Sequence, residues 1–489
     1  MRLRFFSALS CMARQPTEND QGERAARLTG QAVFYCSLLL LALSAVPYGA
    51  VQFWWASFFA AGVFALAALW AVAALLGDGL RLRRDVWLLL PPLALVLFSL
   101  CQALPLGRAA SGDDGGLETS LHYTISADPF ETYNFALRLL ALTLLGAMLL
   151  RFTKSRRRLL ALVLTVVGVG AASALFGLLR QGAQSAELGF VLPALPRGIG
   201  YGQIISRNQF AFMMEMALGL ALGMATARAG RFASSLFYVA LALPVGAALI
   251  LANSRGGILT MLCQLLFLSL LVVPAWPRHV GREAGETGAR SLRRRAGVLA
   301  ARMVLAAALL SLVSVAVVWV GGERVVSNLS TVGEELGAAD ATTRWNTRRV
   351  DIWRATWEMI KDHPVAGVGF GGYWAAIPQY HDASGEYTPQ QAHNDYLELL
   401  ASGGLLALAL FVWFVYVLLR RARAVFQSSD PFRRAASLGA LTGLFGVAVH
   451  SLFDFGLHIT INAALFVALI VIATADVQSA AVKVAPVGD

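Results

Sequence analysis

Residues 159–179, LLALVLTVVGVGAASALFGLL, contain no charged side chain and directly follow the basic sequence KSRRR at residues 154–158. A run of about twenty apolar residues is long enough to cross the hydrocarbon core of a bilayer as an α-helix. A helix is expected because lipid offers the backbone no hydrogen-bond partners. The basic flank is typical of the cytoplasmic end of such a helix. These residues therefore predict one transmembrane helix with its amino-terminal end in the cytoplasm.

Similar apolar runs recur along the whole chain of 489 residues, which is 57% hydrophobic and only 14% charged. A soluble domain of this length would not need so much apolar surface, so we predict an integral membrane protein rather than a very hydrophobic soluble helical protein. The predicted fold is all-α and polytopic, with about twelve transmembrane helices. The predicted spans lie near residues 32–47, 53–76, 86–104, 134–151, 159–179, 208–227, 232–252, 258–276, 298–320, 396–419, 437–453 and 457–476.

The basic residues cluster in alternate loops, near residues 81–84, 154–158, 228–231, 278–295 and 420–434. With both termini on the same side, all of these loops are cytoplasmic by the positive-inside rule. This distribution explains the formal net charge of +11 without nucleic acid as a partner. The first thirty-one residues have no long apolar core, so we expect a cytoplasmic tail and no cleaved signal peptide. The predicted organisation is a tail (1–31), nine spans (32–320), a large outer loop (321–395), three spans (396–476) and a second tail (477–489).

The large loop at 321–395 is the segment with room for an extramembrane subdomain. Within it, Arg344 to Lys361 has the spacing of an amphipathic helix. The helix should end near His363, because Pro364 disfavours a helical residue before it. We expect the helix to lie on the outer leaflet with its tryptophans facing the lipid. The predicted apolar face consists of Val350, Trp353, Trp357 and Ile360.

Several arginines fall on the outer side, against the positive-inside bias. Arg207 and Arg255 stand at ends of predicted spans. The large loop contains three more: Arg344, Arg348 and Arg349. Two or three guanidinium groups in one cleft would bind a diphosphate well, because arginine stays charged and its fork matches phosphate oxygens. The alternative is that each arginine extends to lipid headgroups or pairs with a loop carboxylate.

His393 lies where the loop meets the span near 396–419. An imidazole that titrates near neutrality is a suitable general base for a hydroxyl nucleophile. The alternative is a histidine that only forms a hydrogen bond at a helix start. Asp395 and Glu398 have spacing similar to a capping box, so we interpret them as residues that start the helix.

Three ionisable residues, His450, Asp454 and His458, gather at the predicted outer junction of the last two spans. His450 and Asp454 are four residues apart and are expected to pair along one helix turn, in a structural role. A metal site is less favoured because no further ligands cluster nearby. The four cysteines are scattered and predict neither a disulfide nor a zinc site. The GxGxxG pattern at residues 367–372 lacks a βαβ context and predicts turns rather than a nucleotide site.

Taken in order, these motifs resemble the bacterial O-antigen ligase and polysaccharide polymerase superfamily of membrane glycosyltransferases. The resemblance covers roughly residues 200–460, and the plan of twelve spans with one large late periplasmic loop is also similar. The resembling stretches are Ser206-Arg207-Asn208-Gln209-Phe210-Ala211, Asn253-Ser254-Arg255-Gly256-Gly257, Asp351-Ile352-Trp353, residues 362–371, residues 392–398 and residues 450–455.

The resemblance implies inverting glycosyl transfer from an undecaprenyl-diphosphate-linked oligosaccharide at the periplasmic face of the bacterial inner membrane. Arg207 and Arg255 would hold the diphosphate, with help from Arg344 or Arg348, and His393 would activate the acceptor hydroxyl. No metal and no other cofactor is implied. Two departures concern the acceptor: Gln209 replaces a frequent histidine, and the sequence ASG at 401–403 lacks a frequent acidic residue.

We therefore predict an enzyme that polymerises or transfers lipid-linked oligosaccharide to a glycan or lipid acceptor in exopolysaccharide, capsule or O-antigen synthesis. A ligase to lipid A-core and a protein O-oligosaccharyltransferase are alternatives, and polysaccharide assembly or export proteins are expected partners. A flippase for the same lipids would instead show charged or broken helices at mid-membrane. A peptidoglycan-type glycosyltransferase would rely on a loop carboxylate rather than on His393.

Overall fold

The protein is an all-α membrane protein whose helices follow the predicted apolar runs. The computed structural model describes residues 18–46, 48–76, 86–105, 107–108, 122–183, 200–226, 232–272, 349–381 and 388–477. The long helices are α1 (Glu18–Leu43), α2 (Phe53–Leu76), α3 (Val86–Ala103), α4 (Pro129–Phe152), α5 (Arg156–Ala183), α6 (Arg207–Ala225), α7 (Phe232–Leu251), α8 (Arg255–Val272), α12 (Asp395–Phe426), α13 (Pro431–His450) and α14 (Thr460–Thr474). The shorter elements are α10 (Arg349–Asp362), α11 (Tyr373–Ala376), the 3-10 turns η1 (Tyr48–Ala50), η4 (Ile377–Gln379) and η5 (Gly456–His458), and the paired strands β1 (Gly107–Arg108) and β2 (His122–Tyr123).

Eleven of the twelve predicted spans coincide with a long helix, and the span near 298–320 lies outside the described residues. Seven of the described helices are long and apolar enough to cross a membrane, and α8 and α14 are shorter apolar helices. The chain is therefore a multi-pass membrane protein, while the total of twelve spans stays a prediction.

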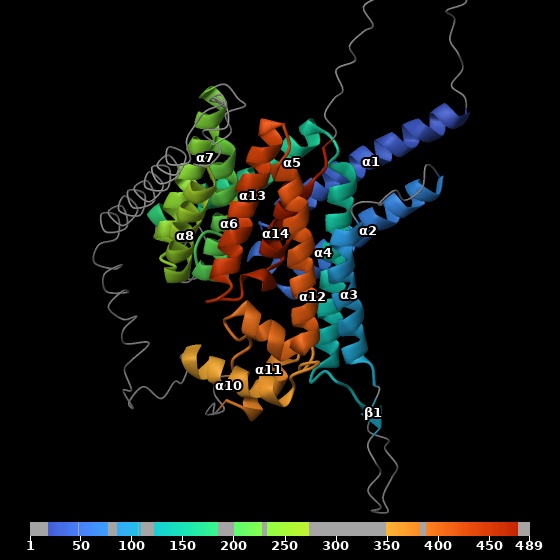
Figure 1. Cartoon of the computed structure of the whole chain (residues 1–489), viewed down its shortest axis with the longest axis vertical. Helices are drawn as coiled ribbons and strands as arrows, with labels where there is room; N and C mark the ends of the chain where they lie inside the picture. Colours follow the sequence, from blue (N-terminus) through green and yellow to red (C-terminus); the bar gives the residue numbers. More distant parts are fainter. Residues whose placement is uncertain are drawn as a thin grey trace, which may run out of the picture.

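The centre of the bundle is the crossing of α6 and α13, with α7 and α8 on one side and α2, α3 and α4 on the other (Figure 1). Two glycine pairs let the backbones touch: a Cβ on Gly223 would lie 2.1 Å from the Cα of Gly439, and one on Gly219 would lie 2.8 Å from the Cα of Gly443. Small residues at such crossings let membrane helices gain close van der Waals contact. This tight crossing fixes the start of α6 relative to the end of α13.

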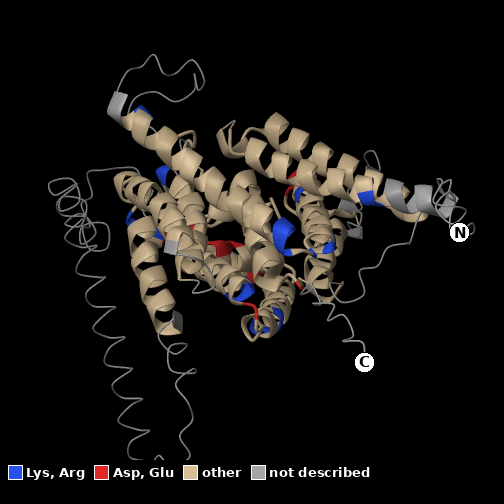
Figure 2. Ribbon diagram, turned by 90° about the horizontal axis from the view of Figure 1, so that it is seen from above, with Lys and Arg blue, Asp and Glu red and all other residues tan. Residues whose placement is uncertain are grey.

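Charged residues are sparse along the helices (Figure 2). At the end of the bundle where α5 and α13 begin, Arg156 lies over the Phe432 ring at 4.9 Å and Arg158 over the Phe34 ring at 5.4 Å. The residues of functional interest lie at the opposite end, where α6, α8 and α12 begin. We call this the site end.

A small subdomain built from α10, α11 and η4 lies at the site end, beneath α12 (Figure 1). Its core contains Met359, Tyr373, Ile377, Ala392 and Ala401. Burial raises the pKa of the Tyr373 phenol, whose hydroxyl shares a hydrogen bond with Thr356 at 2.7 Å. The subdomain therefore has its own packed interior against the start of α12.

The amphipathic helix is confirmed in part. It ends at Asp362, as the position of Pro364 predicted, but its described part begins at Arg349, and residues 344–348 lie outside the described residues. The predicted apolar face is partly wrong: Val350 and Trp357 are exposed, and the side buried in the subdomain consists of Ile352, Ala355, Thr356, Met359 and Ile360. Packing against the subdomain core buries the neighbouring face of α10. The sequence pattern of a single helix gives no information about this packing.

The GxGxxG segment forms turns, as predicted, with Gly367, Gly369 and Gly371 at φ values of +67°, +91° and +84°. The turns bring their backbone against α12, where the Gly369 N–H donates to the carbonyl of Ser402 at 3.0 Å. Gln102 at the end of α3 donates to the same Ser402 carbonyl at 2.9 Å. These bonds join the subdomain to α3 and α12 and so fix its position relative to the membrane helices.

Candidate functional site

His393 stands directly before α12 and contacts a buried carboxylate. Its Nδ1 lies 3.4 Å from Oδ1 of Asp454, and its ring packs edge-on against Phe455 with centroids 4.8 Å apart. An ionised carboxylate only accepts hydrogen bonds, so Nδ1 carries the proton and the Nε2 lone pair is the basic atom. The side chain is 28% exposed, so part of the ring is accessible from outside.

Asp454 is the central residue of the site. Its carboxylate accepts hydrogen bonds from the Phe455 backbone N–H at 2.9 Å and from Nδ2 of Asn208 at 2.5 Å, and it lies 3.7 Å from the guanidinium of Arg349. Burial raises the pKa of this carboxyl, but the contacts with His393, Phe455 and Arg349 outweigh burial and hold the pKa below its ordinary value. Asp454 is therefore a fixed anion at neutral pH.

The same network joins the starts of α6 and α8. Asn208 accepts at Oδ1 a hydrogen bond from Ser254 Oγ at 2.9 Å, and Ser254 Oγ accepts one from the Gly257 N–H at 3.1 Å. Arg207 precedes Asn208 and Arg255 follows Ser254 in the chain, and they are the first residues of α6 and α8. The structure thus brings the two predicted arginine positions to one place, beside the His393–Asp454 pair.

This arrangement is electrostatically suited to an anion. Two helix amino termini, those of α6 and α8, point their positive dipole ends toward the site end. Arg207 is exposed and Arg255 is half-buried. Two arginines and two helix amino termini therefore lie at the site end, together with the His393–Asp454 pair.

Residues 237–412 match the family model described as O-antigen ligase. The matched stretch includes α7, the arginine start of α8, the described part of the outer loop and His393. The match covers about a third of the chain, and over this stretch the chain is similar to the O-antigen ligase family. The match agrees with the resemblance given by the ordered motifs and supports a membrane enzyme of polysaccharide assembly. No curated protein matches the chain.

The predicted pairing of His450 with Asp454 is wrong. α13 ends at His450, and Asp454 lies beyond this helix end. His450 Nδ1 instead lies 2.7 Å from Oε1 of Glu215 on α6, and the ring stacks on Phe212 at 4.4 Å. Both side chains of the pair are buried in the bundle. His450 is therefore a contact between helices and lies behind the site.

The capping prediction for Asp395 is also corrected. The N-cap of α12 is Asn394, whose Oδ1 accepts from the N–H groups of Tyr396 and Leu397 at 3.0 and 3.1 Å. Asp395 accepts instead from Ser451 Oγ at 2.6 Å. Asp395 therefore still belongs to the helix start, and its bond with Ser451 joins this start to the turn after α13.

Glu398 contacts two different segments. Its Oε2 accepts from the Ala392 N–H at 2.9 Å, and its Oε1 lies 3.1 Å from Nε2 of His458. Burial alone lowers the pKa of His458, but the carboxylates of Glu398 and Asp395 raise it to about 9. His458 is therefore a cation at neutral pH and ties α12 to η5.

Arg344 and Arg348 lie outside the described residues, and their neighbour Arg349 is the loop arginine that reaches Asp454. Sequence reasoning assigned no role to Asn208, Ser254 or Glu215. Asn208 and Ser254 are adjacent to the arginines of the two motifs, and Glu215 is an acidic residue inside an apolar run, which is itself a signal. Across the described ranges, no group of three His, Cys, Asp or Glu side chains is placed to hold a metal ion.

Proposed function

We propose that this protein is an inverting glycosyltransferase that uses an undecaprenyl-diphosphate-linked oligosaccharide at the periplasmic face of the bacterial inner membrane. The single observation that supports this most strongly is the hydrogen-bonded chain from His393 through Asp454 and Asn208 to Ser254. It joins one basic nitrogen to the two helix starts that carry Arg207 and Arg255. An acceptor base beside a diphosphate site is what transfer from a lipid diphosphate requires.

His393 is the proposed general base. Nε2 takes the proton of an acceptor hydroxyl while that oxygen attacks the anomeric carbon of the donor sugar. Asp454, which accepts from Nδ1, stabilises the imidazolium that forms. Base catalysis of this kind contributes roughly 10²–10⁴-fold to the rate. The proton afterwards passes from the imidazolium to water.

The leaving group is the lipid diphosphate itself. As the bond between the anomeric carbon and the phosphate oxygen breaks, the electron pair stays on the diphosphate. Arg207, Arg255 and the two helix amino termini stabilise this charge, and fixed donors of this kind usually contribute more to catalysis than any other single effect. Because these arginines supply the positive charge, we expect transfer to be independent of added metal ions and insensitive to a chelator.

The test is complementation of a strain that lacks the gene with Arg207→Ala, Arg255→Ala and His393→Ala, each checked for abundance in the membrane. All three variants are expected to lose surface glycan, whereas the exposed Arg354→Ala on α10 is a matched control that should retain it. Normal glycan from the three site variants would refute the proposal.

The same experiment separates the candidate forms of the reaction. Accumulation of single lipid-linked repeat units indicates a polymerase, which is our first candidate. Accumulation of full-length lipid-linked polymer indicates a ligase, whose acceptor is lipid A-core or a protein hydroxyl. Lipid-linked glycan trapped on the cytoplasmic side would indicate a flippase and contradict the proposed chemistry.

A further inference from the structure

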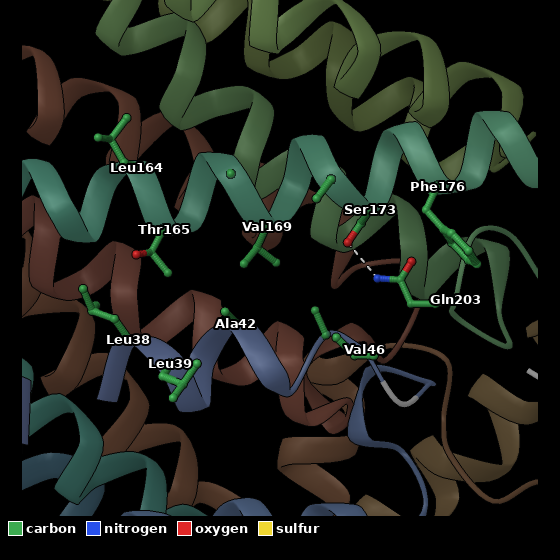
Figure 3. Close-up of a pocket in the computed structure, with 13 residues that line it drawn as sticks. Leu38, Leu39, Ala42, Val46, Leu164, Thr165, Val169, Ser173, Phe176 and Gln203 are labelled. Atoms are coloured by element: carbon green, nitrogen blue, oxygen red, sulfur yellow. Dashed lines mark hydrogen bonds between the residues drawn. The ribbon is translucent and has the colours of Figure 1, made fainter. Parts of the chain in front are cut away.

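A long apolar groove lies between α1 and α5 (Figure 3). Its volume is about 720 Å³, and its lining is apolar except for Thr165, Ser173 and Gln203. Along α5 it extends from Leu164 to Phe176, which corresponds to roughly 18 Å at 1.5 Å per residue. That length is more than half of the roughly 30 Å hydrocarbon core of a bilayer.

The groove exists because small residues face each other across it. Ala42 of α1 and Gly168 and Ala172 of α5 line its walls, and a Cβ added to Gly168 would meet no atom within 4 Å. Protein interiors are otherwise packed without such voids. Leu39 and Val46, at 56% and 57% exposed, border the groove, so it is open sideways toward the surrounding lipid. A hydrocarbon chain would complete the packing that the two helices leave unfinished.

One end of the groove lies at Gln203, which is close in the chain to the candidate diphosphate site. Gln203 closes this end, donating from Nε2 to Ser173 Oγ at 2.7 Å, while its Oε1 is buried without a partner among the described residues. Gln203 belongs to the turn that leads into α6, four residues before Arg207. Four residues of chain span at most roughly 14 Å, so the groove end and the Arg207 backbone are close.

We propose that this groove binds the part of the polyprenyl tail nearest the diphosphate of the lipid-linked donor. The assignment rests on the proposed function. The apolar channel and the cationic helix starts are continuous through one short turn, and they match a molecule that has a single hydrocarbon chain joined to a diphosphate. The groove would guide the anomeric carbon to the site end by holding the chain that carries it.

The test fills the groove and compares two donors with the same glycan diphosphate, one with a full-length polyprenyl tail and one with a short two-isoprene tail. Gly168→Leu and Ala172→Phe place bulk in the groove, and both new residues are compatible with a helix interior. Leu175→Phe is the matched control, because Leu175 lies on the same helix, is exposed, and does not line the groove.

Displacing two methylenes of the tail should raise KM for the long-tail donor about tenfold in both groove variants. KM for the short-tail donor should not change, and Leu175→Phe should behave as wild type with both donors. Unchanged kinetics with the long tail, or equal loss with both tails, would overturn the groove assignment.

A binding measurement separates this proposal from the proposed function. A polyprenyl diphosphate with a photoreactive group near its head should label peptides of α1 and α5 in the wild type and not in Gly168→Leu. Such labelling without any transfer would refute only the function. Labelling of other helices would overturn the proposal. Labelling that is abolished by excess phospholipid vesicles but not by unlabelled polyprenyl diphosphate would show that the groove binds phospholipid, and would also overturn it.

Discussion

At the scale of single residues, His393 is held in a backbone conformation that non-glycine residues rarely adopt. Its φ is +51°, in the left-handed region, which costs on the order of 1–3 kcal/mol unless the surroundings enforce it. The neighbours do so: Glu398 binds the Ala392 N–H, Trp353 donates to the Ala392 carbonyl at 2.9 Å, and Asn394 caps α12. The strain is fixed on both sides of the residue, which directs the imidazole toward Asp454.

Replacing Asp454 with asparagine tests this alignment. An amide binds Nδ1–H less strongly and does not stabilise the imidazolium, so we expect the transfer rate of Asp454→Asn to fall by about 10²–10⁴-fold with little change in donor KM. Steady-state kinetics with purified protein measures both values. Glu358→Gln, which removes an exposed carboxylate on α10, is the control. A variant that keeps more than a tenth of the wild-type rate would contradict the role of Asp454.

His458 gives a pH dependence with a definite sign. Its folded-state pKa of about 9 lies above the ordinary value of 6.5. The pairing with Glu398 and Asp395 therefore stabilises the fold fully below about pH 6.5, and this stabilisation is lost as the pH rises through about 9. The ring is 41% exposed, so solvent screens part of the effect.

We therefore expect the melting temperature of the wild type in detergent to fall between pH 7 and pH 9.5 more than that of His458→Gln. The exposed His363→Gln is the matched control and should follow the wild type. A His458→Gln curve parallel to the wild type would show that the pair does not contribute.

The sequence singles out His393, Arg207 and Arg255 as candidates, because each stands in a short polar motif at the end of an apolar run. It also singles out Asp454 but not the partners of Asp454, which come from α6, α10 and the segment before α12. Spacing along one chain suggested His450 as the partner, since residues four apart meet on a helix. α13 ends at His450, and His450 pairs with Glu215 on α6 instead. Such a contact between helices is visible only in the packed structure.

At the scale of elements, α12 is interrupted where the sequence predicted an unbroken span. Gly404 has φ +60° and ψ −159°, a conformation that is nearly restricted to glycine. The break frees the N–H of Leu405, which donates to the carbonyl of Pro364 at 2.8 Å. The outer turns of α12 are thus tied to the subdomain, and the interruption sets how the subdomain packs below the bundle.

Gly404→Ala should accordingly destabilise the protein by about 1–3 kcal/mol from backbone strain. The added Cβ would also lie 2.3 Å from the Val365 carbonyl oxygen, which forces the backbone to shift. Thermal unfolding in detergent measures the change. Gly246→Ala in α7 is the control, because its Cβ would meet one atom at 3.9 Å and alanine favours the helix by about 0.5–1 kcal/mol. Equal melting temperatures for the two variants would contradict this account of α12.

At the scale of the whole molecule, hydropathy predicts where the helices lie in the sequence, whereas contacts between helices determine how they pack together. Runs of about twenty apolar residues locate the spans, because the thickness of the bilayer fixes the length of a span. These runs do not predict which helices contact each other, because side chains that face lipid and side chains that face another helix are similarly apolar. The glycine crossing of α6 and α13 and the groove beside α5 therefore emerged only from the packed structure.

The buried pair of Glu215 and His450 shows how the bundle supports the site from behind. The pair joins α6 to α13, with Glu215 seven residues after Asn208 and His450 four residues before Asp454. His450 Nε2 would lie 2.7 Å from a Cβ added to Gly256 at the start of α8. Removing one member of a buried pair leaves an uncompensated polar group and costs about 3–5 kcal/mol, whereas replacing both by apolar residues is often neutral. Glu215→Leu and His450→Phe should therefore each destabilise strongly, and the double variant should be more stable than either single variant.

A double-mutant cycle of unfolding free energies in detergent measures this coupling. Phenylalanine retains a flat ring that can stack on Phe212, so the double variant keeps the packing of α6 on α13. Additive losses would mean that the two side chains act independently and that the crossing of the helices, not the pair, positions the site. A stable double variant with normal transfer would assign the pair to folding alone. If the double variant is stable but transfers slowly, the pair also aligns the ends of α6 and α13 that carry Asn208 and precede Asp454.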